Sequence, residues 1–245
     1  MNGVKLLFWA VAGALLIGAG ATPCRAEDNA IIKGKIIFAG DMAKCKRSIL
    51  DTGKDPNCKA AKKKIGSYAV ICNKKTDPVT LRNVLVSIKE GLGDRKYPAP
   101  STPVTLTQFG CEYDPHVFGI MEGQTLKVLN GDNTNHNIHF LPKKNQQYNF
   151  SQPKKDLKKG RDLTLMAEDV FKVKCDVHPW MGCRIGVFTH PFFAVTGKDG
   201  TFELKNVPPG TYVIEAWHEK FGSVTMNVEV ASGAVVEKDF TFDPK

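Results

Sequence analysis

The chain has 245 residues, with 34 Lys+Arg against 25 Asp+Glu and a formal net charge of +9. Hydrophobic residues make up 42% of the chain and charged residues 24%, a balance that excludes a largely disordered or collagen-like protein. The length favours one or two domains. Only the N-terminus carries a long apolar run, which argues against a protein with several membrane spans.

Residues 1–26 have the pattern of a Sec signal peptide. Lys5 precedes an uncharged apolar stretch over residues 6–21, and small residues lead to Ala26. The stretch is short for a transmembrane helix, so we expect cleavage near Ala26 and export to the periplasm or another extracytoplasmic space. An uncleaved anchor is the alternative, and a lipidated Cys24 is less favoured. Cleavage would remove two basic residues, leaving 32 against 25 acidic ones and a charge of +7.

Export would place the remaining cysteines in an oxidising compartment, where disulfides are the default state. Six would be left in the mature chain: Cys45, Cys58, Cys72, Cys111, Cys175 and Cys183. If one of them binds a metal ion, at least one other stays unpaired.

Apolar and polar residues alternate with period two along most of the chain, which predicts an all-β protein. Strands are expected at 31–38, 83–89, 125–130, 171–175, 202–204, 212–216 and 224–230. Gly, Pro, Asn and Asp turns separate these segments, as in antiparallel sandwiches. No amphipathic helix longer than about two turns is evident. The Lys-rich residues 43–64 could form a short helix or a loop held by its two cysteines.

Two segments carry the candidate chemistry, N-H-N-I-H-F at 135–140 and C-D-V-H-P-W-M at 175–181. The second supplies Cys175, His178 and Met181, and the first supplies another histidine. A thiolate, two imidazoles and a thioether suit a soft, redox-active metal, and His₂Cys with a weak axial Met is the arrangement of blue-copper sites. A rigid β scaffold would limit the rearrangement when such an ion changes charge.

Strand alternation predicts which of these side chains can meet. Cys175 shares a strand face with Phe171 and Val173, so its sulfur should point into the core. His136 and His139 are three residues apart and face opposite sides of an extended strand, so only one of them can line a given site. The alternation by itself does not decide which of the two is the ligand.

The spacing Cys-x₂-His-x₂-Met in C-D-V-H-P-W-M resembles the ligand loop of amicyanin-type cupredoxins, and N-H-N-I-H-F resembles the segment with their first His ligand. The resemblance covers residues 104–190 and implies a Greek-key cupredoxin domain with one type 1 copper ion. It implies that the ligands are His136, Cys175, His178 and Met181, and we therefore expect His139 at the surface or beside the site. A second thiol so close to this loop, at Cys183, departs from the pattern. It could pair with another cysteine or compete as a ligand.

A second resemblance lies in the stretch A-V-T-G-K-D-G-T-F-E-L-K-N-V-P-P-G-T-Y-V-I-E-A-W-H-E, which is similar to carboxypeptidase regulatory-like, transthyretin-like β-sandwiches. Residues 191–245 alone are too few to bury a robust core. Such modules begin with strands like those expected at 31–38 and 83–89. We therefore predict a smaller, discontinuous sandwich, made from about 30–100 and 191–245, in which the cupredoxin is inserted.

The expected organisation is a signal peptide at 1–26, N-terminal strands with a Cys/Lys-rich segment at 27–103, a cupredoxin domain at 104–190 and a C-terminal sandwich segment at 191–245. The whole chain resembles exported bacterial plastocyanin-like proteins with this layout.

The family resemblance of D-P-N-C and G-C-E-Y favours a disulfide between Cys58 and Cys111. Cys45–Cys72 is then the next candidate pair, and Cys183 stays free.

Other residues with possible chemistry have structural interpretations. His116 is expected to be a hydrogen-bonded structural residue, and His190 a residue of the domain junction. The sequence Trp217-His218-Glu219 is expected to pack at a strand end, although its aromatic ring could dock a partner. Three methionines are expected in the core rather than in a copper relay: Met121, Met166 and Met226.

A basic segment lies between the two ligand segments and contains Lys143, Lys144, Lys154, Lys155, Lys158, Lys159 and Arg161. It would steer an acidic redox partner toward the copper end in a salt-dependent way. Export and the absence of a nucleic-acid motif disfavour nucleic acid. Contact with an anionic membrane or cell-wall polymer would be peripheral.

The sequence lacks the common catalytic motifs G-x-S-x-G, H-E-x-x-H, C-x-x-C-H and the phosphate loop, so we do not expect an enzyme. A thiol hydrolase built on Cys175 is disfavoured because Met181 fits a metal better and no orienting acid is evident. Three hypotheses remain: an exported type 1 copper protein that carries single electrons, a copper-handling protein without electron transfer, and a non-catalytic envelope binding module.

Overall fold

The computed structural model describes residues 29–52, 55–60 and 65–244, so the predicted signal peptide at 1–26 lies outside it. Strands dominate the described chain, which confirms the predicted all-β fold class. Residues 43–64 contribute to a 3₁₀ helix at Met42–Cys45 and to the short helix α1 at Pro56–Ala60. Within the described ranges, no helix has the length and apolar character needed to cross a membrane.

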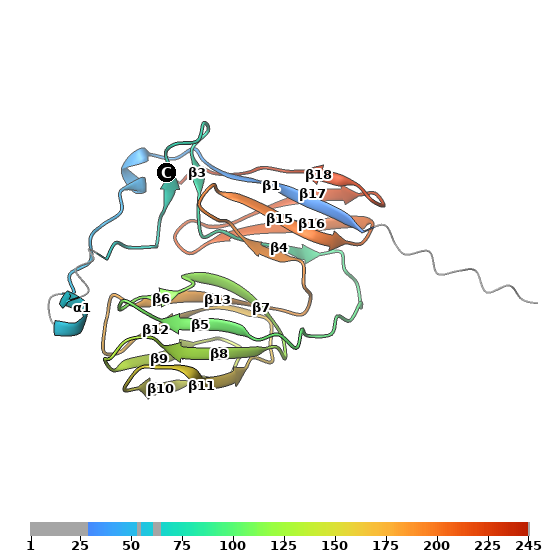
Figure 1. The fold of residues 1–245 in the computed structure, drawn as a ribbon. Helices are drawn as coiled ribbons and strands as arrows, with labels where there is room; N and C mark the ends of the chain where they lie inside the picture. Colours follow the sequence, from blue (N-terminus) through green and yellow to red (C-terminus); the bar gives the residue numbers. More distant parts are fainter. Residues whose placement is uncertain (1–28, 53–54, 61–64, 245) are drawn as a thin grey trace, which may run out of the picture.

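One β-sandwich is built from two sheets, with the strand orders β10-β9-β12-β13-β7 and β11-β8-β5-β6 (Figure 1). Its strands are β5 (Val104–Gln108), β6 (Tyr113–Asp114), β7 (Val117–Met121), β8 (Thr125–Asn130), β9 (His136–Leu141), β10 (Asn149–Gln152), β11 (Asp156–Thr164), β12 (Asp169–Lys174) and β13 (Gly182–Phe188). Alternate residues of both sheets meet in its core, among them Val128, Ile138 and Val173.

The second sandwich combines strands from both ends of the described chain. One sheet has the order β15-β1-β3-β2, with β18 and β19 also paired to β1, and the other has the order β14-β4-β16-β17. The strands are β1 (Ala30–Phe38), β2 (Cys72–Asn73), β3 (Thr80–Leu81), β4 (Leu85–Glu90), β14 (Phe193–Val195), β15 (Thr201–Val207), β16 (Gly210–His218), β17 (Gly222–Val230), β18 (Val235–Glu237) and β19 (Phe240–Phe242).

The strand pairing shows how the two sandwiches share the chain. β1 pairs with β15, β18 and β19, and β4 pairs with β14 and β16. The chain therefore leaves the second sandwich after β4, forms the first, and returns at β14. The domain boundaries and the likeness to a carboxypeptidase regulatory-like module stay predictions.

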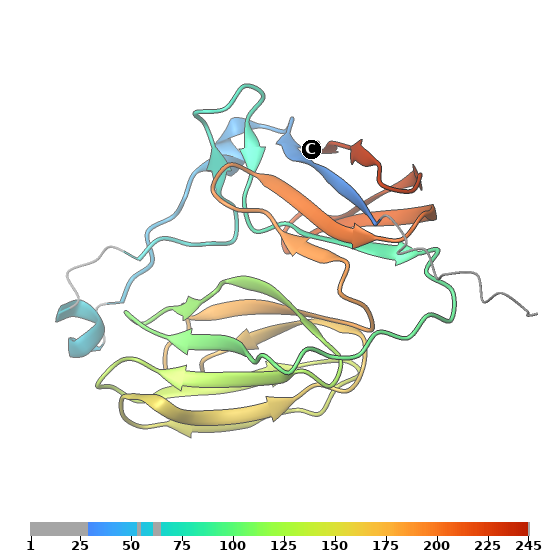
Figure 2. The same cartoon turned by 45° about the vertical axis from the view of Figure 1, so that its right-hand side comes forward.

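The strand β4 is buried on both faces, which the alternating sequence pattern did not predict. Val86 and Ile88 belong to the core of the second sandwich. Leu85 faces the other way and packs with Val117 and Phe188 of the first sandwich. Figure 2 shows the sheet that contains β4 on the side of the upper sandwich nearest the lower one. The two sandwiches therefore share an apolar contact.

Residues around this contact follow their predicted structural roles. Trp217 packs against the apolar cluster between the sandwiches. The ring of His190 is buried, and its Nε2 lies 2.9 Å from the carbonyl oxygen of Ile88 in β4. The structure thus confirms His190 as a junction residue and Trp217 as a packed one.

A partly buried ionic cluster also joins the two sandwiches. The Glu219 carboxylate lies 2.5 Å from Nε2 of His116 and 2.7 Å from the Arg184 guanidinium. The other ring nitrogen of His116, Nδ1, lies 3.0 Å from the carbonyl oxygen of Gly182. His116 is therefore the hydrogen-bonded structural residue that was predicted. Burial raises the pKa of Glu219, but hydrogen bonding to His116 and the charges of His116 and Arg184 outweigh it and lower that pKa.

We expect Glu219→Gln to reduce the free energy of unfolding by about 2–3 kcal/mol at pH 7, somewhat below the loss for a fully buried pair because His116 and Arg184 are partly exposed. Because the pKa of Glu219 is lowered, the ionised carboxylate stabilises the fold fully at pH values above 4.5, the ordinary pKa of this group. This contribution is lost as the pH falls through the folded-state pKa. Urea unfolding from pH 7 to pH 3 should show the two proteins converging in acid.

The exposed pair Lys205–Glu203 offers a matched control, because its oxygen and nitrogen are 3.9 Å apart at the surface. Glu203→Gln should change stability by less than about 0.5 kcal/mol. Equal effects of both substitutions at pH 7 would contradict a stabilising role for the ionic cluster of Glu219, His116 and Arg184.

Both predicted disulfides form, Cys45–Cys72 and Cys58–Cys111. The first ties the 3₁₀ helix to β2, and the second ties α1 to the loop before β6. Cys175 and Cys183 are the free cysteines of the described chain. The disulfides are compatible with an extracytoplasmic location.

Candidate metal centre

Antiparallel pairing of β9 with β12 brings the two predicted ligand segments together. Lys174 at the end of β12 pairs with His139, so Cys175, the next residue, lies across from Ile138. Ile138 is two residues from His136 and therefore on the same face of β9. The strand register thus places the Cys175 thiol beside the His136 ring, 39 positions earlier in the chain.

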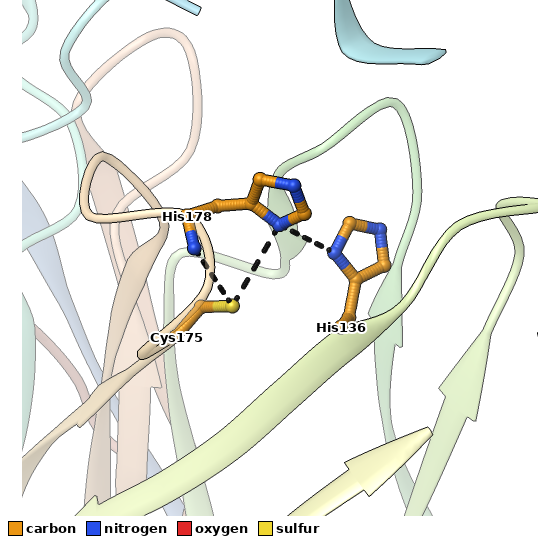
Figure 3. A group of neighbouring side chains, drawn as sticks. All are labelled: His136, Cys175 and His178. Carbon is orange, nitrogen blue, oxygen red and sulfur yellow. Dashed lines mark hydrogen bonds between the residues drawn. The ribbon is translucent and has the colours of Figure 1, made fainter. Parts of the chain in front are cut away.

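Three ligand atoms converge at this end of the first sandwich (Figure 3). Nδ1 of His136 lies 3.1 Å from Nδ1 of His178, and that nitrogen lies 3.8 Å from the sulfur of Cys175. All three atoms are within 4.8 Å of one another. The side chains are buried, with 0% exposure for His136, 1% for His178 and 2% for Cys175.

The donor set and its spacing fit one soft metal ion. Metal–nitrogen and metal–sulfur bonds in proteins are about 2.0–2.3 Å long. Separations of 3.1 and 3.8 Å are shorter than two such bonds end to end, so a single ion can contact all three atoms. Two imidazoles and a thiolate suit copper or zinc.

The surroundings of Cys175 favour its thiolate, the form that binds metals. Burial raises the pKa of the thiol, but hydrogen bonding with His136 and with backbone N–H groups outweighs it and lowers the pKa to about 7. The backbone N–H groups of Asn137 and His178 point at the sulfur, with nitrogen–sulfur distances of 3.4 and 3.3 Å. The protein therefore stabilises negative charge on this sulfur without a metal ion.

Cys183 has the opposite environment. It lies in β13 opposite Val173, has 0% exposure, and belongs to the apolar core of the first sandwich. Burial raises the pKa of its thiol well above the ordinary value. Cys183 is thus a protonated core residue and a poor competitor for a metal ion.

A closed loop carries His178 and Met181. The N–H of Met181 donates to the carbonyl of His178 over 2.9 Å, and the N–H of Cys175 donates to the carbonyl of Met181 over 3.3 Å. The Met181 side chain is buried within the same apolar cluster as Cys175. These two backbone hydrogen bonds close the loop between Cys175 and Met181, and the assignment of Met181 as an axial ligand is a proposal.

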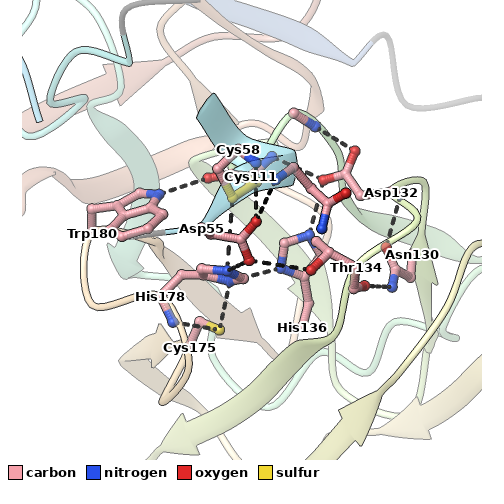
Figure 4. The surroundings of a disulfide bond; sticks show 12 residues. Asp55, Cys58, Cys111, Asn130, Asp132, Thr134, His136, Cys175, His178 and Trp180 are labelled. Carbon is pink, nitrogen blue, oxygen red and sulfur yellow. Dashed lines mark hydrogen bonds and ion pairs between the residues drawn. A yellow bond between two sulfur atoms is a disulfide. The ribbon is translucent and has the colours of Figure 1, made fainter. Parts of the chain in front are cut away.

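A carboxylate holds the outer nitrogen of each histidine ring (Figure 4). Nε2 of His136 lies 2.9 Å from Asp132, and Nε2 of His178 lies 2.9 Å from Asp55. Burial raises the pKa of Asp55, but hydrogen bonds from His178 and backbone N–H groups outweigh it and lower the pKa to about 2. An ionised carboxylate at Nε2 keeps the proton on that nitrogen and leaves the Nδ1 lone pair for a metal ion.

Neither carboxylate was predicted from the sequence. Asp132 stands four residues before His136, so its proximity was a local signal that could have been used. Asp55 lies 123 positions before His178, and only the disulfide Cys58–Cys111 hinted that its segment reaches this end of the sandwich. The sequence pattern therefore defined the converging donors but not the groups that orient them.

The remaining predicted residues lie outside the converging set. His139 faces away from the core, with its Nδ1 2.9 Å from the Asp176 carboxylate. Met121 is buried and Met226 is partly buried, as expected for packing residues. The prediction of Met166 as a core residue is wrong: its side chain is 65% exposed, because it follows the end of β11 in a connecting loop.

A scan against protein-family models finds no match, and no curated protein matches the chain. The matching solved structures include cupredoxins. A copper-containing nitrite reductase from Thermus scotoductus SA-01 is 22% identical over 38% of this chain, with a TM-score of 0.29. A purple cupredoxin from Nitrosopumilus maritimus is 21% identical over 35% of this chain and 99% of its own, with a TM-score of 0.30.

A single-site variant of amicyanin in its Cu(I) form is 17% identical over 35% of this chain and 82% of its own, with a TM-score of 0.31. This chain spans only 25% of the nitrite reductase. Because these TM-scores are far below 0.5, the structural similarities support no conclusion about the function of this protein.

Proposed function

We propose that this protein is an exported mononuclear type 1 copper protein that carries single electrons between redox partners and is not itself an enzyme. The observation that supports the proposal most is the buried convergence of two imidazole Nδ1 atoms and the Cys175 sulfur at the end of a β-sandwich. His136, Cys175 and His178 would hold the ion, with Met181 as a weak axial ligand.

Copper bound here would supply reversible one-electron chemistry between Cu(I) and Cu(II). The role of the chain would be to keep the ligand geometry nearly constant during that change. His136 and Cys175 come from the ends of paired strands, and carboxylates hold both rings. Burial of the side chains would exclude water from the ion. Little rearrangement on electron transfer is therefore expected.

Addition of Cu(II) to purified apoprotein, followed by visible spectroscopy, tests the proposal. An intense blue thiolate-to-Cu(II) absorption at one equivalent, with reversible one-electron reduction, is expected. Copper uptake with slow or absent electron exchange would favour copper handling instead. A stable apoprotein with no specific copper uptake would favour an envelope binding module and contradict both copper functions.

Replacing Met181 with leucine should retain copper and raise the reduction potential, because loss of a weak donor favours Cu(I). Cyclic voltammetry of the copper-loaded variant and wild type measures this shift. Met121→Leu, in the core away from the ligand loop, is the control and should leave the potential unchanged. Loss of all copper binding in Met181→Leu, or a lowered potential, would show that the axial assignment is wrong.

We also propose that the partner is acidic where it docks. Lys154 and Lys155 are exposed and closely follow Gln152, which pairs with His136 at the metal end of β9. Lys143 and Lys144 follow the other end of β9. Lys143 and Lys144 thus lie away from the metal end of β9, and Lys154 and Lys155 are the residues expected to steer a partner toward the metal centre.

A further inference from the structure

The two carboxylates beside the histidine rings come from different parts of the chain. Asp132 lies in the loop between β8 and β9, within the sandwich that forms the metal centre. Asp55 lies outside that sandwich, at the start of α1. A segment remote in sequence therefore reaches over the centre and contacts His178.

Both oxygens of Asp55 are used. Oδ1 accepts the backbone N–H groups of Asn57 and Cys58, at 2.7 and 3.2 Å, which caps the first turn of α1. Oδ2 lies 2.9 Å from Nε2 of His178 and accepts the Thr134 hydroxyl at 3.2 Å. One carboxylate thus fixes the local turn with one oxygen and the ring of His178 with the other.

The disulfide Cys58–Cys111 anchors this turn to the same site (Figure 4). The sulfur of Cys58 lies 3.7 Å from Nε2 of His178. The backbone N–H of Cys111 donates to Asp132 at 2.9 Å, and its carbonyl accepts the Trp180 indole N–H at 3.1 Å. The disulfide and its flanking backbone therefore contact groups beside both histidines. The His178 side chain is buried at this place, with 1% exposure.

We propose that the turn Asp55–Cys58 is a built-in cap of the metal centre and that Asp55 is a positioning residue for His178. This inference rests on the proposed function and extends it beyond the strands that supply the ligands. The Asp55 carboxylate holds the Nε2 proton of His178, which directs the Nδ1 lone pair toward Cys175 and His136. The cap also covers the ring, so a redox partner meets this turn rather than His178.

Two substitutions of Asp55 separate positioning from helix capping. Serine caps helices well, but its single oxygen cannot accept from the turn N–H groups and from His178 at the same time. Glutamate keeps a carboxylate with two acceptor oxygens, so Asp55→Glu retains an acceptor for the Nε2 proton of His178. Removal of a carboxylate that orients a metal-binding histidine typically costs about 10–100-fold in metal affinity.

We therefore expect Asp55→Ser to bind copper about 10–100-fold more weakly than wild type and to shift the thiolate-to-copper absorption. Asp55→Glu, which keeps the carboxylate, should recover at least part of the affinity and the wild-type band position. Competition titration of Cu(I) and visible spectra of the Cu(II) form measure both effects. Far-UV circular dichroism of the two apoproteins checks that the fold is retained.

Ring ¹H–¹⁵N correlation spectra of the copper-free proteins supply a readout that does not depend on copper. Wild type and Asp55→Glu should carry the His178 proton on Nε2, and Asp55→Ser should shift population toward Nδ1–H. Wild-type copper affinity and band position in Asp55→Ser, or an unchanged His178 tautomer, would overturn the positioning role. If wild type bound no copper, the proposed function would fail, and the ring spectra would still report on the Asp55–His178 contact.

Discussion

Cys175→Ala is expected to abolish the intense visible absorption of the copper-loaded protein completely. The absorption requires electron transfer from a thiolate to Cu(II), and Cys175 is the converging sulfur whose pKa is lowered. His136 and His178 would remain, so weak copper binding without the blue colour should persist. Visible spectra at one equivalent of Cu(II), together with electron paramagnetic resonance, measure both properties.

Cys183→Ala is the matched control, because it removes the other free thiol from the same sandwich. Its spectrum should be unchanged, while the small cavity left in the core should reduce the free energy of unfolding by about 1 kcal/mol. A blue Cys175→Ala variant, or a colourless Cys183→Ala variant, would mean that the thiolate ligand has been assigned to the wrong cysteine.

The double substitution Cys58→Ala/Cys111→Ala should cause the second large effect. This disulfide closes a loop with a sequence separation of 53 residues, and the chain-entropy model predicts a loss of about 4 kcal/mol when such a link is removed. The anchor of the Asp55 turn would be lost as well, so copper affinity should fall together with stability. Urea unfolding of the apoproteins and copper competition titrations test the two parts separately.

Cys45→Ala/Cys72→Ala separates a general loss of stability from a specific effect on the metal centre. Its disulfide has a sequence separation of 27 residues, which corresponds to a similar loss of about 3.5 kcal/mol. It ties the 3₁₀ helix to β2 in the second sandwich, so copper affinity should stay close to that of wild type. Equal losses of copper affinity in the two double variants would contradict a specific contribution of the Cys58–Cys111 anchor.

Local sequence patterns were sufficient for the strands and for the orientation of the candidate donors. Period-two alternation placed Cys175 with Phe171 and Val173 on the buried face, and the structure has all three side chains in one core. The same reasoning separated His136 from His139. These predictions succeed because the direction of a side chain on a strand depends only on parity along the chain.

Contacts that depend on the arrangement of whole sandwiches could not be predicted in this way. The second face of β4 is buried because another sandwich packs against Leu85, which leaves no signal in the alternation of β4 itself. Asp55 reaches His178 through a segment whose path depends on a disulfide and a short helix. Met166 was assigned to the core from its residue type alone, and the end of β11 leaves it exposed.

X-ray absorption spectroscopy at the copper edge, on protein loaded with one equivalent of copper, tests the central claim most directly. We expect one short copper–sulfur contact and two imidazole nitrogens around a single ion, and the sulfur contact should disappear in Cys175→Ala. A first coordination sphere made only of nitrogen and oxygen would contradict the claim that these side chains form a thiolate copper site.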